Sequence, residues 1–328
     1  MNLYNKEKNN FTVIKKVSDR LNPDELNSVT GIEQDFKGNL WLGTWNGITV
    51  INRSVRIIKQ FFAQPDGTKN FNYRFSTVIY KDRGGNIWVG TNGQGLLKYD
   101  RETGKFVVYR TESGNNNSLS NNYISAIFQD NSNNLWIGTL HGLNKFNPRR
   151  NNFMRIFNDP NISSSIISNQ ISSVTQDRGG LIWVGTTAGI SKFYLPLDKF
   201  YYYQRIPEHP GKSLTSSSII SVYIDRGGNI WAGTLDGLNE IKRNGRIIQY
   251  KNEPGNGNSI SSNFIRSVLV DSKDMVWIGT NFNGLNEFNP FTGRYKLFTY
   301  DMNDTNSISN NGVTCICEAR NGTLWFGT

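Results

Sequence analysis

One five-residue phrase recurs seven times along the chain: an apolar residue, Trp, any residue, Gly and Thr. Its tryptophans are Trp41, Trp88, Trp136, Trp183, Trp231, Trp277 and Trp325. Consecutive copies lie 46 to 48 residues apart. Self-similarity at a fixed period in this range is typical of a repeat architecture, in which each unit buries its apolar face against its neighbours. We therefore expect these seven of the eight tryptophans to belong to the scaffold.

The repeat around Trp136 reads as four short strands. Residues 124–130 alternate apolar and polar side chains, the period of a half-buried strand, and 135–139 are nearly all apolar. Residues 143–147 and 153–157 complete the unit, and a long polar loop leads to the next one. Aromatic residues make up 12% of the chain, and the 32 glycines suit many tight turns. Four antiparallel strands repeated seven times predict an all-β fold, a seven-bladed β-propeller.

The last blade requires both ends of the chain. The C-terminal end supplies two strands, 312–318 and 323–328, and the other two are expected within about residues 2–18. There, Tyr4-Asn5 and Asn10-Phe11 match Phe146-Asn147 and Asn152-Phe153 of the third repeat. A shared blade leaves no open sheet edge. We expect 1–328 to form one closed single-domain ring, although the end at Thr328, inside a copy of the phrase, favours a fragment of a longer protein.

A short turn precedes each tryptophan. An Asp lies six residues before Trp in six repeats: Asp35, Asp82, Asp130, Asp177, Asp225 and Asp271. A Gly lies three residues before Trp in five repeats: Gly38, Gly85, Gly180, Gly228 and Gly322. Asp accepts hydrogen bonds from its own turn, and Gly adopts the positive φ that such turns need. Because the carboxylates recur in six of the seven repeats and do not converge, we favour turn capping over a metal or catalytic site. The seventh repeat has Ala319 at the Asp position.

The two cysteines, Cys315 and Cys317, are two residues apart on a predicted strand. Such neighbours rarely meet disulfide geometry, so two buried small hydrophobic residues are favoured over a bridge or a metal pair. A lone C-x-C is a weak metal signal, and His141 and His209 are the only histidines. We expect no metal and no cofactor.

The fourth repeat resembles the two-component regulator propeller repeat. Residues 171–186 carry the motif, ISSVTQDRGGLIWVGT. The resemblance covers nearly the whole chain and implies the extracytoplasmic sensor region of a bacterial hybrid two-component histidine kinase. Family members often pair two propellers, followed by a β-sandwich, a membrane helix and a kinase, and several sense oligosaccharides. The resemblance therefore implies a non-catalytic sensor whose partners are a second propeller, a sandwich domain or a dimer mate. The chain itself has no signal peptide and no apolar run long enough to span a membrane.

The non-repetitive residues gather on one face. In each blade the turn after the Trp strand and the long loop after the fourth strand lie at the same end, which we call the post-Trp face. Polar amides, arginines and aromatic residues there suit an oligosaccharide or another small polar ligand, and Trp45 is the strongest single candidate. Blades two and six carry one extra residue in this turn. The candidate ligand-binding residues are Trp45, Asn46, Arg74, Asn92, Gln94, Tyr123, His141, Asp236, Arg266, Asn281 and Phe282. The alternative is that each is an ordinary solvated loop residue.

The opposite ends of the blades, which we call the first-turn face, are rich in basic residues. They are Lys37, Arg53, Arg83, Arg101, Arg149, Arg150, Arg178, Lys199, Arg226, Arg243, Lys273, Arg294 and Arg320. The long loops of the post-Trp face carry acids instead, so the net charge of +10 is expected to be polarised. A basic face would meet an acidic partner, a second propeller or anionic lipid headgroups. The alternative is a solvated charged rim. No reading helix is evident, so sequence-specific nucleic-acid binding is not expected.

Two other function classes remain open. A glycoside hydrolase needs two carboxylates facing one cleft, and a polysaccharide lyase needs a positioned base. Asp236 is the one acid in a post-Trp turn, and His141 has no visible orienting group. A protein–protein interaction scaffold is the second alternative, because fold alone does not decide function.

Overall fold

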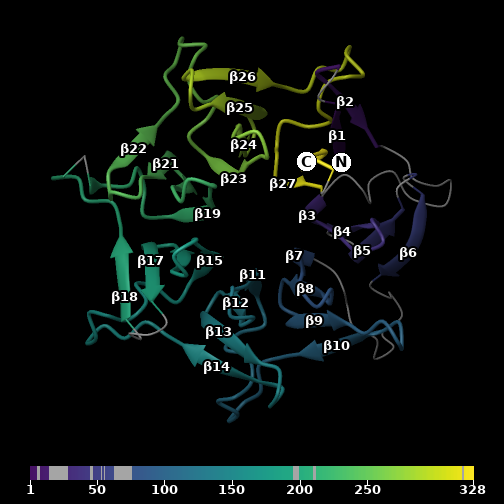
Figure 1. The fold of residues 1–328 in the computed structure, drawn as a ribbon, viewed down its shortest axis with the longest axis vertical. Coiled ribbons are helices and arrows are strands. Elements are labelled where there is room, and N and C mark those ends of the chain that lie inside the picture. The colour runs from purple at the N-terminus through teal and green to yellow at the C-terminus, as the bar shows by residue number, and fades with distance from the viewer. Residues whose placement is uncertain are drawn as a thin grey trace. The chain divides into compact units, whose positions relative to one another are not determined.

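The structure is a computed structural model, and it describes residues 1–5, 8–14, 29–44, 47–52, 54, 56–62, 76–194, 199–209, 212–319 and 321–328. Its strands form seven antiparallel sheets of four strands each, and no α-helix occurs among these residues (Figure 1). Each sheet corresponds to one copy of the repeat. The predicted fold class, an all-β seven-bladed propeller, is confirmed.

The chain divides into two compact units. One comprises Met1–Ile14, Asn161–Ser168 and Thr175–Thr328, and the other Lys15–Pro160 and Asn169–Val174; we call them the C-terminal and N-terminal units. The prediction that 1–328 is one domain stays a prediction.

The N-terminal unit holds three blades. Blade 1 is β3 (Val29–Gln34), β4 (Leu40–Thr44), β5 (Gly47–Ile51) and β6 (Ile57–Phe62); blade 2 is β7 (Ser76–Lys81), β8 (Ile87–Thr91), β9 (Leu96–Tyr99) and β10 (Phe106–Tyr109); blade 3 is β11 (Ile124–Gln129), β12 (Leu135–Thr139), β13 (Gly142–Asn147) and β14 (Asn152–Ile156).

The remaining blades belong to the C-terminal unit, apart from the start of β15. Blade 4 is β15 (Ile171–Gln176), β16 (Ile182–Thr186), β17 (Gly189–Tyr194) and β18 (Lys199–Tyr203); blade 5 is β19 (Ile219–Ile224), β20 (Ile230–Thr234), β21 (Gly237–Ile241) and β22 (Ile247–Tyr250); blade 6 is β23 (Ile265–Val270), β24 (Val276–Thr280), β25 (Leu285–Asn289) and β26 (Arg294–Phe298); blade 7 is β27 (Cys315–Glu318), β28 (Leu324–Gly327), β1 (Asn2–Asn5) and β2 (Asn10–Val13).

The repeat tryptophans pack between neighbouring blades, as predicted. In the N-terminal unit Trp88 of blade 2 lies in one cluster with Ile124 and Phe146 of blade 3. In the C-terminal unit Trp231 lies with Ile265 and Phe288 of the next blade. The Gly of the phrase permits this contact, because a Cβ on Gly138 would come within 2.5 Å of Ile171 Cγ2. The phrase glycine of blade 3 thus lies against an aliphatic side chain on the first strand of the next blade.

The repeated Asp caps its turn and also holds the tryptophan. In blade 3, Asp130 Oδ1 accepts the backbone N–H groups of Ser132 and Asn134, and Oδ2 accepts the indole Nε1–H of Trp136 at 2.8 Å. The Trp–Asp bond recurs in blades 1 to 6. Gly85 has φ +78°, and Asn133 takes φ +64° where blade 3 lacks the glycine. The capping prediction is confirmed, and the bond to the indole is an addition that sequence reasoning did not supply.

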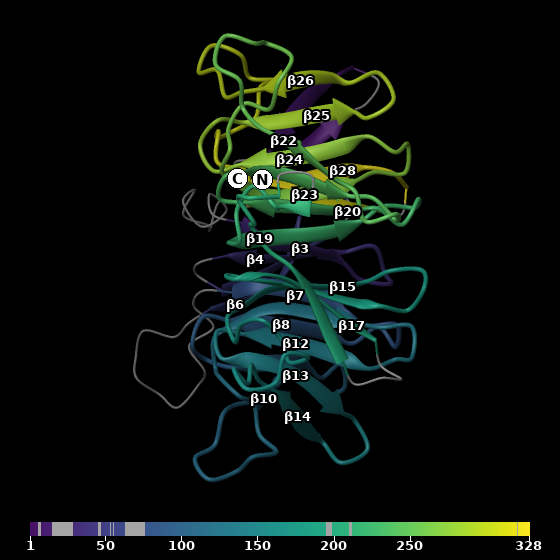
Figure 2. The same cartoon turned by 90° about the vertical axis from the view of Figure 1, so that its left-hand side faces the viewer.

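Both ends of the chain build blade 7, as predicted. The strand order is β2-β1-β28-β27, so the first and last strands pair antiparallel. Asn2 Nδ2 donates to Thr328 Oγ1 at 3.2 Å, and both views place the two termini side by side (Figures 1 and 2). Tyr4 and Phe11 from the N-terminal strands pack against Phe326.

The two cysteines of β27 are half-buried thiols that form no disulfide, so the disulfide alternative is wrong. Burial raises the pKa of the Cys315 thiol to about 11, which keeps it protonated at neutral pH. No group of three or more metal-ligating side chains occurs in the described ranges.

Candidate functional site

The threonine of the repeated phrase shapes the post-Trp turn. In blade 3, Thr139 Oγ1 donates to the Gly142 carbonyl at 2.8 Å and accepts the His141 N–H at 3.0 Å. The same pair of bonds recurs in blades 2, 4, 5 and 6. The turn backbone is therefore scaffold, and only the side chains at its tip are free to differ between blades.

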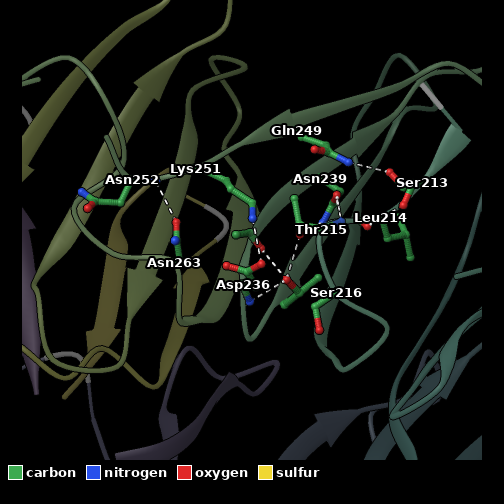
Figure 3. Close-up of polar contacts among 12 residues, drawn as sticks. Ser213, Leu214, Thr215, Ser216, Asp236, Asn239, Gln249, Lys251, Asn252 and Asn263 are labelled. Carbon is green, nitrogen blue, oxygen red and sulfur yellow. Dashed lines mark hydrogen bonds and ion pairs between the residues drawn. The ribbon is translucent and has the colours of Figure 1, made fainter. Parts of the chain in front are cut away.

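The long loops are anchored by a second repeated network. In blade 5, Asn239 Oδ1 accepts the Thr215 N–H at 2.9 Å, and its Nδ2 donates to Thr215 Oγ1 at 2.8 Å (Figure 3). Thr215 also bonds Thr234, and the preceding Leu214 is buried. Equivalent anchors are Ser120 with Asn144, Ser261 with Asn286 and Ser309 with Asn2. The signal in the sequence is a Ser-Leu/Ile-Ser/Thr triplet recurring in register with the tryptophans, which sequence reasoning did not use.

In the N-terminal unit, four predicted site residues lie at the post-Trp face. Asn92 forms an isolated bridge with Tyr123, whose side chain is 45% exposed. Gln94 Oε1 accepts a hydrogen bond from Arg110 at 2.8 Å. His141 is exposed, and its ring contacts Phe157 at a centroid distance of 5.4 Å.

In the C-terminal unit, Asp236 is not a free carboxylate. Its Oδ2 pairs with Lys251 Nζ at 2.7 Å, next to the Asn252–Asn263 bond that holds the following loop (Figure 3). Arg266 lies exposed at the bulge of β23. Asn281 donates its N–H to the Phe264 carbonyl, and Phe282 is 75% exposed. Trp45, Asn46 and Arg74 lie outside the described residues.

A groove of about 510 Å³ lies at the post-Trp face of blade 6. Phe282 and Asn283 of the enlarged turn line it, together with Leu297 on β26 and loop residues Glu253 and Ser259. The loop is pre-organised, because Asn256 Nδ2 donates to Glu253 Oε2 at 2.7 Å and Ser259 Oγ accepts the Glu253 N–H at 3.0 Å. Of the predicted site residues that the structure describes, only Phe282 lines this groove.

One fourth-strand position that lines this groove differs between blades. In blade 3 it is Arg155, which lies opposite Asn144, lines a cavity of about 640 Å³ and donates to the carbonyls of Ser118, Asn115 and Leu119. In blade 5, Gln249 donates to the Ser213 carbonyl. In blade 6 the same position, opposite Asn286, is Leu297.

Leu297 cannot donate a hydrogen bond, so the carbonyl of Ser259 has no donor among the described residues. Its counterparts, the carbonyls of Ser118 and Ser213, both have one. Tyr295, which also lines the groove, has its pKa raised by burial and then by the nearby Glu253, so its hydroxyl stays protonated at neutral pH. The groove thus combines an open carbonyl, a carboxylate and exposed apolar side chains.

The first-turn face is less free than the sequence suggests. Arg83 Nη1 donates to the Asp130 carbonyl of blade 3 at 2.6 Å, and Arg226 Nη1 to the Ser272 carbonyl of blade 6 at 2.9 Å. These two arginines join the first turns of neighbouring blades. Arg53 and Arg320 lie outside the described residues, and nothing is described of the Lys199 side chain.

Comparison with solved structures first confirms the propeller fold. The fold resembles the extracellular domain of the putative hybrid two component system BT3049 from B. thetaiotaomicron, with a TM-score of 0.76 and 22% identity over 94% of this chain and 40% of that one. It also resembles virginiamycin B lyase from Staphylococcus aureus, with a TM-score of 0.65, 13% identity and 93% of both chains covered. These likenesses concern the fold alone. No described helix is long and apolar enough to span a membrane.

The sequence then gives the family. The model of the "Two component regulator propeller" matches residues 25–46, 70–93, 118–141, 165–188, 213–236, 259–282 and 307–328, and the chain belongs to this family. It is also 31% identical over 110 residues to Histidine kinase P4 of Formosa agariphila. That match covers 32% of this chain and 8% of the kinase, and the chain covers 40% of the BT3049 domain, so it spans less than half the length of both of these relatives.

Proposed function

We propose that this chain is the non-catalytic, extracytoplasmic ligand-sensing propeller of a bacterial two-component receptor. Membership of the regulator propeller family supports the role, as do the neighbours that are extracellular domains of hybrid two-component systems. Signalling itself would belong to parts of a receptor beyond these residues.

The ligand is an oligosaccharide or a similar polyhydroxylated molecule, bound at the post-Trp face in the blade 6 groove. The observation that carries this proposal is the substitution of Leu297 at a position that Arg155 and Gln249 use to satisfy the loop carbonyls. A sugar hydroxyl can donate to the Ser259 carbonyl in place of the missing side chain. Phe282, 75% exposed, offers a ring on which the apolar face of a sugar can stack.

The geometry favours sensing over catalysis. Asp236 is engaged with Lys251, and His141 contacts a phenylalanine ring, so neither is poised as an acid or base by a described polar group. Virginiamycin B lyase shows that enzymes use this fold, but its likeness to the chain concerns only the fold.

Leu297→Arg provides the decisive test. The new guanidinium should donate to the loop carbonyls as Arg155 does in blade 3, so that the Ser259 carbonyl is no longer open to a ligand, while the melting temperature is preserved or raised. An oligosaccharide library is screened by thermal shift, and hits are quantified by calorimetry. We expect Leu297→Arg to abolish binding and Phe282→Ala to weaken it by roughly tenfold, because one stacking contact is lost.

Phe291→Ala is the matched control. Phe291 is 80% exposed but follows β25, at the opposite end of blade 6, so its loss should leave affinity unchanged. Binding that survives in Leu297→Arg would exclude this groove. Turnover of a bound sugar would contradict the sensor role. Capture of a protein that the Leu297→Arg variant still binds would favour a protein–protein interaction scaffold.

A further inference from the structure

Two pockets of the same construction lie at the first-turn face, one in each unit. The pocket in the N-terminal unit lies between blades 1 and 2, and the one in the C-terminal unit between blades 4 and 5; each has a volume of about 270 Å³. The floor of each pocket is the repeat tryptophan of one blade, Trp41 or Trp183, beside an isoleucine of the next, Ile87 or Ile230.

An arginine from the turn after the third strand closes one side of each pocket. Arg101 and Arg243 occupy the same repeat position, and both pack over the positive-φ glycine of the first turn in their own blade. A Cβ on Gly85 would come within 2.5 Å of Arg101 Nη2, and a Cβ on Gly228 within 3.4 Å of Arg243 Nε. Blades 3 and 6 have Pro148 and Pro290 at this position.

A lysine stands on the other side of each pocket. In blade 1 the lysine is Lys59 on the fourth strand, opposite Val50 on the third. In blade 4 it is Lys192 on the third strand, opposite Tyr201 on the fourth. The two lysines therefore belong to equivalent cross-strand pairs but lie on different strands of the pair. Lys59 Nζ lies 5.0 Å from the Tyr99 ring centroid, and Lys192 Nζ lies 5.5 Å from that of Tyr203. These cation–aromatic contacts hold each ammonium at the pocket without neutralising it.

Positive charge exceeds negative charge in both pockets. The one acid lining each pocket, Asp35 or Asp177, offsets a single positive charge and is hydrogen-bonded to its own turn and to the tryptophan indole. Lys37 is the third cation of the first pocket; Arg178 and Lys242 are further cations of the second, where Lys242 pairs with Glu240. The remaining cations have no carboxylate partner among the described residues; they are Lys37, Lys59 and Arg101 in the first pocket and Arg178, Lys192 and Arg243 in the second.

We propose that these two pockets are binding sites for small organic carboxylates, with one molecule in each. A guanidinium presents a planar fork to a carboxylate, and the tryptophan and isoleucine floor suits a ring or a short carbon body behind it. Enclosure between two blades favours a small acid over the flat surface of an acidic protein. The site is distinct from the blade 6 groove, and it does not depend on the proposed function of that groove.

Glucuronate is the probe, and glucose is its neutral counterpart. Calorimetric titration of the whole chain at low salt should show two equivalents of glucuronate, with binding that weakens as salt is added, and none of glucose. Arg243→Met and Arg101→Met, which keep the apolar stem, should each weaken one of the two equivalents by roughly tenfold, the loss expected for a charged hydrogen bond. The double variant should weaken both.

Arg149→Met is the control, because Arg149 lies in the same kind of turn in blade 3 but lines neither pocket; it should retain both equivalents. Circular dichroism verifies that each variant folds. Glucuronate binding that is absent, or unchanged in the double variant, would overturn the proposal. The proposal would also be overturned if the two arginines bound polyglutamate but not glucuronate. That result would identify the pockets as docking sites for an acidic protein segment.

Discussion

At the residue scale, one Asp carboxylate in each of six blades both caps its turn and accepts the indole N–H of the repeat tryptophan. Asp130 satisfies the N–H groups of a tight turn and accepts the indole N–H of Trp136, which is fully buried. A buried indole without an acceptor would lose the hydrogen bond it makes with water. Blade 7 illustrates the difference: Ala319 replaces the Asp, Trp325 is only half-buried, and Glu318 bonds Ser272 of blade 6 instead.

Ala319→Asp should therefore stabilise the protein. The turn backbone already matches the other blades, since the Ala319 N–H donates to the Thr323 carbonyl as the Asp130 N–H does to Asn134. A new carboxylate there can cap the turn and accept the Trp325 indole N–H, a gain of about 1 kcal/mol in the free energy of unfolding. Urea denaturation measures the effect, and Asp130→Ala is the opposite control, expected to destabilise. A lower midpoint for Ala319→Asp would contradict this account.

At the scale of elements, the long loops are part of the framework. The long loops that lead into blades 3, 5, 6 and 7 each follow a fourth strand, bury one Leu or Ile, and tie a Ser or Thr to an Asn on a third strand. Their composition is polar, yet these hydrogen bonds hold them to the blades. Rigid loops present the groove residues at fixed positions, which lowers the entropic cost of binding.

Asn239→Leu tests this anchor. Blade 2 carries Leu97 at the same strand position, so the side chain suits a third strand. In blade 5 the change leaves the buried Thr215 N–H without its partner and removes one of the two partners of the Thr215 hydroxyl, which should cost about 1–3 kcal/mol and speed amide exchange at Thr215 and Ser216. Lys251→Gln, which removes the exposed pair with Asp236, should cost less than about 1 kcal/mol. Equal effects of the two changes would disprove a structural role for the loop anchor.

At the scale of the whole molecule, both units bury ionisable hydroxyl and thiol groups. Burial raises the pKa of Tyr80 and Tyr109 in the N-terminal unit, and that of Tyr223, Tyr250 and Tyr295 in the C-terminal unit. Blade 7 adds Tyr4, raised to about 12, and Cys315, raised to about 11. In the unfolded chain these groups ionise near their ordinary values, 10.0 for tyrosine and 9.0 for cysteine.

The protein should therefore be sensitive to alkali. A raised pKa in the folded state means that the folded chain retains protons that the unfolded chain has lost, so stability is full below pH 9 and falls as pH rises towards 12. We expect the urea midpoint to drop across this range, and tyrosinate absorbance to rise together with the loss of folded circular dichroism. Cys315→Ser should reduce the early part of the drop. Tyrosines that ionise with ordinary midpoints in a folded protein would contradict the buried phenols.

The sequence by itself determined the scaffold, because the scaffold is periodic. The Trp recurs in all seven repeats, and the turn Asp and turn Gly, where present, meet similar neighbours, so spacing alone predicts seven four-stranded blades and the one shared by both termini. It also pointed to the enlarged turn at Phe282, since an insertion stands out against a period. Only the tertiary structure decided which positions are open. Whether Leu297 leaves a loop carbonyl open, or Arg101 and Arg243 flank a pocket, depends on which side chains face one another across strands and between blades. Phe282 and Leu297 are 15 positions apart in the chain, and Phe36 and Arg101 are 65 apart, so no local pattern records these pairings.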